Sequence, residues 1–177
     1  MKKYIICLIL SICCSLTSFA QLPREICGFK LGVTTKSEVL NYFKANNLKY
    51  GEIDDDDSYV AVKTKFQYGG VKWPYLAVFF YNDKLYKINL NADRNLCSFE
   101  ELDEMADKIL DYLMGKYEKY IDEYSKFLFE EKLFLLFEDG KTNMTFYFAL
   151  DETDKESLYI SFADKKIEDF LDNQKKK

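Results

Sequence analysis

The order of helix-like and strand-like segments is the feature that most constrains how this chain can fold. Residues 59–68 alternate apolar and polar side chains, as a half-buried strand does, and Gly69-Gly70 then supplies a hairpin turn. Two further strand-like runs follow, "WPYLAVFFY" and "KLYKINL", with the turn residues Asn82-Asp83 between them. These segments predict antiparallel strands that are joined by short turns.

A helix with the same start signal precedes each group of strands. Thr35 is followed three residues later by Glu38, and Ser98 by Glu101, and both pairs have the pattern of a capping box. The second helix carries its apolar residues on one face, namely Phe99, Leu102, Met105, Ile109, Leu113 and Tyr117. The strand-like runs "KFLFEEKLFLLFED", "TNMTFYFAL" and "SLYISFA" come next, and a short amphipathic helix ends the chain.

The chain therefore repeats one order of elements, a helix followed by three strands, in halves at about 28–95 and 96–177. We expect an α+β fold in which an antiparallel sheet carries two main helices on one face. No Pro/Ser-rich linker divides the halves, so residues 21–177 are expected to form a single domain.

The first 20 residues have the pattern of a cleaved signal peptide. Two lysines precede an apolar segment, residues 5–16, that is too short to span a membrane as a stable helix. Ser18 and Ala20 then place small residues where a signal peptidase cleaves. No later segment is apolar for long enough to span, so no stable membrane insertion is expected. The sequence predicts export to the periplasm or the exterior.

A lipoprotein is the alternative, because Cys13 and Cys14 lie within the apolar segment. A lipidation signal needs a small residue just before the cysteine, and Ile12 precedes Cys13. The cleaved, soluble form is therefore favoured.

Removal of the leader leaves two cysteines, Cys27 and Cys97, and changes the net charge from −5 to −7. In an exported chain, such a pair predicts a disulfide, and the alternative is two buried thiols. Each cysteine precedes one of the two helices, so helices that lie side by side would bring the pair within bonding distance. We predict one intramolecular disulfide.

The residue inventory argues against most catalytic mechanisms and cofactors. The chain has no histidine, which excludes imidazole bases, serine–histidine and cysteine–histidine pairs, and histidine-dependent zinc sites. It has no glycine-rich phosphate loop. We expect no cofactor and no catalytic residue. Two carboxylates that hydrolyse a glycan remain an alternative, although no pair among the thirty acids stands out.

The acidic run at residues 54–57 consists of Asp54, Asp55, Asp56 and Asp57. The run does not match a calcium loop of the EF-hand type. Counted from Asp54, Tyr59 stands where that loop needs glycine, and Lys65 stands at the twelfth position, where it needs glutamate. A solvated turn is favoured over a cation site, so no metal is predicted. The acidic surface argues against nucleic acid as a partner and would attract a basic protein.

Trp73 and Tyr75 are the candidate interface residues. They flank Pro74, which cannot donate to a sheet ladder and so indicates an edge or a bulge. If the protein has a contact surface, both would lie on the sheet face away from the helices, where such aromatics anchor partners. The alternative, which is slightly favoured, places Trp73 in the core.

The phrases "GFKLGVTTKSEVLNYFKANN", "FEELDEMADKILDYLMGKYEKY" and "LYISFADKK" resemble small exported Bacteroidetes proteins of unknown function. The layout is also similar to beta-lactamase inhibitor proteins and to small outer-membrane-assembly lipoproteins. The resemblance implies binding to another protein and no enzyme activity, with no binding residue carried over. We expect an exported, non-catalytic protein-binding domain of the inhibitor or immunity type. The alternatives are a cell-envelope structural or assembly factor and a carboxylate-dependent glycan hydrolase.

Overall fold

The computed structural model describes residues 21–53, 57–122, 128–129, 132–150 and 156–175. The expected signal peptide and Asp54, Asp55 and Asp56 lie outside these residues. Within the described part of the chain, no helix combines the length and the apolar composition that a membrane crossing requires.

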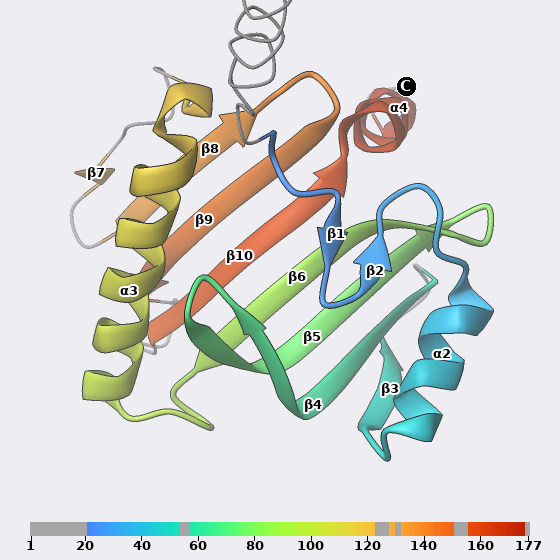
Figure 1. Cartoon of the computed structure of the whole chain (residues 1–177), viewed down its shortest axis with the longest axis horizontal. Coiled ribbons are helices and arrows are strands. Elements are labelled where there is room, and N and C mark those ends of the chain that lie inside the picture. The colour runs from blue at the N-terminus through green and yellow to red at the C-terminus, as the bar shows by residue number, and fades with distance from the viewer. Residues whose placement is uncertain (1–20, 54–56, 123–127, 130–131, 151–155, 176–177) are drawn as a thin grey trace, which may run out of the picture.

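An antiparallel sheet of eight strands forms the centre of the molecule (Figure 1), in the order β3-β4-β5-β6-β10-β9-β8-β7. Its strands are β3 (Lys49–Ile53), β4 (Ser58–Tyr68), β5 (Val71–Tyr81), β6 (Lys84–Asp93), β7 (Leu128–Phe129), β8 (Lys132–Glu138), β9 (Thr142–Leu150) and β10 (Glu156–Asp164). Pairing of β6 with β10 joins the two halves of the chain into one sheet.

Two main helices lie on one face of this sheet, as the sequence predicts. Figure 1 shows α3 (Phe99–Tyr117) crossing β8, β9 and β10, and α2 (Lys36–Ala45) beside β3. A small hairpin of β1 (Glu25–Ile26) and β2 (Phe29–Lys30) lies between the two helices on the same face. Both capping boxes are present, so the α+β prediction and the two helix starts are confirmed.

The core lies between the sheet and this layer of helices. Leu76, Leu90, Ile160, Phe146 and Leu135 are partners in successive strands and form one buried row across the sheet. The helices complete the core with the residues Val39, Phe43, Leu102, Ile109 and Leu113. Because side chains alternate along a strand, the residues between these buried ones face the other side of the sheet.

Each half contributes one strand more to the sheet than predicted. In the second half, the run at 126–139 contains two strands, β7 and β8, which pair with each other. In the first half, β3 (Lys49–Ile53) pairs with β4 at the edge of the sheet. This short strand buries none of its residues fully, so it lacks the apolar alternation by which the other strands were recognised.

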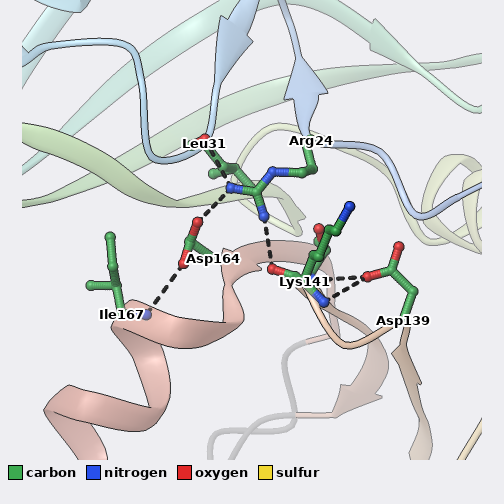
Figure 2. Close-up of polar contacts among 7 residues, drawn as sticks. Arg24, Leu31, Asp139, Lys141, Asp164 and Ile167 are labelled. Carbon is green, nitrogen blue, oxygen red and sulfur yellow. Dashed lines mark hydrogen bonds and ion pairs between the residues drawn. The ribbon is translucent and has the colours of Figure 1, made fainter.

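The first described residues hold the C-terminal helix α4 (Lys165–Lys175) in place (Figure 2). Arg24 donates to Asp164 Oδ2 at 2.5 Å, to Leu31 O at 3.1 Å and to Lys141 O at 2.8 Å. Asp164 Oδ1 accepts from the backbone of Ile167 at 3.3 Å and so caps the first turn of α4. The start of the described chain is thereby fastened to its last helix.

Candidate functional site

The face of the sheet opposite α2 and α3 is the candidate site, and we call it the open face. Tyr75, Asn91, Tyr159, Tyr147 and Phe134 are partners in successive strands and form one row across it, which we call the aromatic row. The rings of Tyr147 and Tyr159 have centroids 5.0 Å apart and planes tilted by 31°. Burial raises the pKa of Tyr159, and the neighbouring Tyr147 raises it further. The hydroxyl of Tyr159 therefore stays protonated near neutral pH.

Smaller side chains lie beside the aromatic row. One row of partners covers four of the five strands that carry the aromatic row, and we call it the polar row: Ala77, Asn89, Ser161 and Thr145. Because these side chains are shorter than the tyrosines, the surface is hollowed along this row. The resulting cavity has a volume of about 320 Å³, and its lining also includes Lys87, Asn91 and Tyr159.

Helix α4 meets the open face at the end of this cavity. Lys87 Nζ lies 3.1 Å from Glu168 Oε1, and Asn143 Nδ2 donates to Glu168 Oε2 at 2.9 Å. A second ion pair joins Lys165 Nζ to Glu138 Oε1 at 3.0 Å. Both oxygens of the Glu168 carboxylate are therefore engaged by residues of the sheet.

Three side-chain oxygens near the cavity lack a partner within the described residues. They are Oδ1 of Asn89, Asn91 and Asn143, and each is almost completely shielded from solvent. A buried oxygen without a hydrogen bond destabilises the fold by about 1–3 kcal/mol. Unsatisfied polar groups of this kind require an explanation, and a donor brought by water or by a bound molecule is the common one.

The two candidate interface residues lie in different places. Trp73 is completely buried and its Nε1 donates to Tyr68 O at 3.3 Å, so it belongs to the core. A buried indole cannot contact a partner, and the interface assignment of Trp73 is corrected accordingly. Tyr75 is half-buried and lies in the aromatic row, on the face away from the helices.

The predicted disulfide is absent, because Cys27 and Cys97 are both free, half-buried thiols. The prediction assumed that the two helices lie side by side. Instead, Figure 1 shows α2 beside one edge of the sheet and α3 over β8, β9 and β10, with the β1–β2 turn that contains Cys27 between them. Burial raises the pKa of Cys27 to about 12 and also raises that of Cys97, so both groups are protonated thiols at neutral pH.

The aspartate run is described only at Asp57, whose carboxylate forms an ion pair with Lys36 Nζ. Among the described residues, no group of three or more Cys, Asp or Glu side chains is arranged to hold a metal ion. The ion pair with Lys36 gives Asp57 a structural role at the start of β4.

Sequence reasoning missed Lys87, Asn89 and Asn91, although the alternation in "KINLNAD" contains the signal. Ile88, Leu90 and Ala92 are buried, so the residues between them must line the other face. What the sequence could not show is which strands become neighbours, and thus that Tyr159 and Ser161 would lie beside these asparagines.

Comparison with known proteins gave no significant match among protein-family models, curated proteins or solved structures.

Proposed function

We propose that this protein is an exported, non-catalytic protein-binding domain that holds its partner against the open face of the sheet. The observation that carries the proposal is the aromatic row, which places three tyrosines beside a polar hollow on a face that α2 and α3 leave uncovered. The pattern of the first 20 residues supports export.

The dimensions of the row favour a protein as the occupant. Neighbouring strands are about 4.8 Å apart, so a row over five strands extends for about 19 Å. That length matches the contact surface of a protein better than that of a small molecule. Tyrosine combines a large ring with a hydroxyl group and is common among the residues that contribute most to binding between proteins.

The chemistry of the hollow favours binding over catalysis. A carboxylate hydrolase needs one acid to protonate the leaving group and a second carboxylate across the substrate. The carboxylate at the end of the cavity, Glu168, has both oxygens engaged by Lys87 and Asn143. Its arrangement supports a structural role, namely docking α4 on the sheet.

Site-specific crosslinking followed by affinity measurement tests the proposal. A photoreactive amino acid at Tyr147 or Tyr159 should crosslink to the partner that co-purifies from the cell envelope. The same amino acid at Phe99, which is 48% exposed on α3, is the control and should not. With the identified partner, Tyr159→Ala should weaken binding at least about tenfold, because truncating a central interface tyrosine costs over 1 kcal/mol.

The outcome also separates the inhibitor type from the assembly type. A partner whose activity falls on binding supports an inhibitor or immunity role, whereas a stable envelope complex supports an assembly factor. Crosslinks only from Phe99, or affinity that survives loss of both Tyr147 and Tyr159, would refute binding through the open face.

A further inference from the structure

A second cavity, of about 440 Å³, lies between the end of α2 and strand β4, on the helix-bearing side of the molecule. Its lining combines two lysines, Lys63 and Lys65, with two asparagines, Asn46 and Asn47. Tyr42, Leu48 and Phe66 provide the apolar part of the wall. The volume falls within the range typical of small-molecule sites.

An irregularity in β4 places both lysines at this cavity. The pairing of β4 with β5 shifts register between Val62 and Phe66, and Lys63 has a positive φ of 53°. Thr64 turns inward and its Oγ1 donates to Trp73 O at 2.5 Å, so the lysines on either side of it face outward together. A positive φ is unfavourable for a lysine, and such strain is found most often where a side chain has a special task.

The lining of the cavity is positively charged, whereas the whole chain is negatively charged. The chain has a net charge of −5, yet residues 39–51 and 58–82 contain no aspartate or glutamate. The same two segments contain five lysines: Lys44, Lys49, Lys63, Lys65 and Lys72. Among the described residues, neither Lys63 nor Lys65 has an ion-pair partner. Two unpaired ammonium groups at one cavity favour an anion.

The apolar wall adds a flat surface to this positive charge. Tyr42 stacks on Phe66 with ring centroids 5.9 Å apart and planes 26° apart. Phe29 packs edge-on against both rings, with ring centroids 5.2 Å from that of Tyr42 and 6.2 Å from that of Phe66. Tyr42 remains 39% exposed, so part of its surface is available to a ligand. Planar groups pack favourably against such aromatic rings.

We propose that this cavity binds a small ligand that carries an anionic group, phosphate or carboxylate, on a planar ring. Lys63 and Lys65 neutralise the anionic group, and the stacked pair of Tyr42 and Phe66 contacts the ring. The site stands on its own residues and does not depend on what the open face binds.

Titration of the isotope-labelled protein with phenyl phosphate, inorganic phosphate and benzoate, followed by NMR, tests this site. We expect changes in the NMR chemical shifts of Asn46, Asn47 and the side chains of the two lysines in the cavity. Phenyl phosphate should bind more tightly than inorganic phosphate. The comparison with benzoate decides between phosphate and carboxylate. The double variant Lys63→Gln/Lys65→Gln should bind at least about tenfold more weakly, because both charges facing the anion are lost.

Lys166→Gln/Lys175→Gln is the matched control, since it removes the same charge from exposed positions on α4. It should change the affinity less than about twofold, because distant surface charges are screened by salt. Equal weakening in both double variants, or the absence of localised shifts with all three ligands, would overturn the proposal.

A single variant separates the binding role of Lys63 from a structural one. Lys63→Gly removes the charge and suits the positive φ of this position, so it should raise the melting temperature while it weakens binding of phenyl phosphate. A higher melting temperature with unchanged affinity would refute the role of Lys63, and a lower melting temperature would refute the strain on which its placement is argued.

Discussion

Side chains from the same strands build the two faces of the central sheet very differently. On the covered face, Leu90, Ile160 and Phe146 form a row that is completely buried beneath the helices. On the open face, one residue along, Asn91, Tyr159 and Tyr147 are each half-buried. The first row stabilises by removing apolar surface from water. The second row keeps polar atoms beside its rings, as expected of a sheet face that no helix layer covers.

The largest effect should come from truncating the covered face. Phe162 is completely buried and its ring lies 4.9 Å from that of Tyr68. Phe162→Ala should therefore lower the free energy of unfolding by about 3–5 kcal/mol. The neighbouring variant Tyr159→Ala, on the open face, should lower it by less than about 1.5 kcal/mol, since its ring is half-buried. Urea unfolding followed by circular dichroism measures both. Equal losses would show that the open face is part of the core.

Effects of intermediate size are expected in helix α4, which has contacts near both faces of the sheet. Asp164 and Arg24 hold it near the covered face, and Glu168 holds it on the open face. Asp164 caps the helix and bonds Arg24, and its side chain is 13% exposed. Asp164→Ala should cost about 1–3 kcal/mol through loss of the cap and of a charge-assisted hydrogen bond. Glu168→Ala removes the contacts with Lys87, whose side chain is 30% exposed, and with Asn143 Nδ2. Both partners are only half-buried and can be rehydrated, so the variant should cost less than about 1 kcal/mol.

Hydrogen exchange of the α4 amides distinguishes these two contacts. Asp164→Ala should accelerate exchange along the helix, whereas Glu168→Ala should affect mainly the turn that faces the sheet. Faster exchange in Glu168→Ala than in Asp164→Ala would place the main support of α4 on the open face.

The smallest effect, and one of opposite sign, is expected at the unpartnered asparagines. Asn89→Leu removes an unsatisfied Oδ1 and should leave stability unchanged or raise it by up to about 1 kcal/mol. Asn143→Leu removes the same kind of oxygen but also breaks the bond from Nδ2 to Glu168, so it should be the less stable of the two. Thermal unfolding of the pair decides this. A marked loss in Asn89→Leu would mean that the oxygen is satisfied in the folded protein, for example by water.

The covered face was far more predictable than the open one. The capping boxes at Thr35 and Ser98 depend on neighbours in sequence, and both agree with prediction. Strand β4 lies where it was predicted, but the predicted alternation is wrong in part, because Ala61 is buried whereas Val60 and Val62 are only half-buried. The placement of α2 relative to α3 depends on the order of strands, which no local pattern encodes. The disulfide between Cys27 and Cys97 was inferred from that placement and failed with it.

Trp73 illustrates the same limit at a single residue. Its neighbour Pro74 indicated an edge or a bulge, and the irregular register lies close by, at Val62 and Phe66 of the facing strand. The side on which the indole lies was decided by the path of β4 and β5 in three dimensions. The hollow on the open face was equally hidden, because its lining comes from β6, β9 and β10.

The bond from Arg24 to Asp164 joins residues 140 positions apart and has a consequence for how the chain acquires its structure. During synthesis, which starts at the N-terminus, the β3-β4-β5-β6 part of the sheet can form early, since these strands are consecutive in the sequence. Strand β6 lacks its second neighbour until β10 has been synthesised. Arg24 lacks the carboxylate of Asp164, the last residue of β10, until the same moment. Closure of such distant contacts is slow relative to local pairing. Folding of this protein is therefore expected to finish only after nearly the whole chain has left the ribosome.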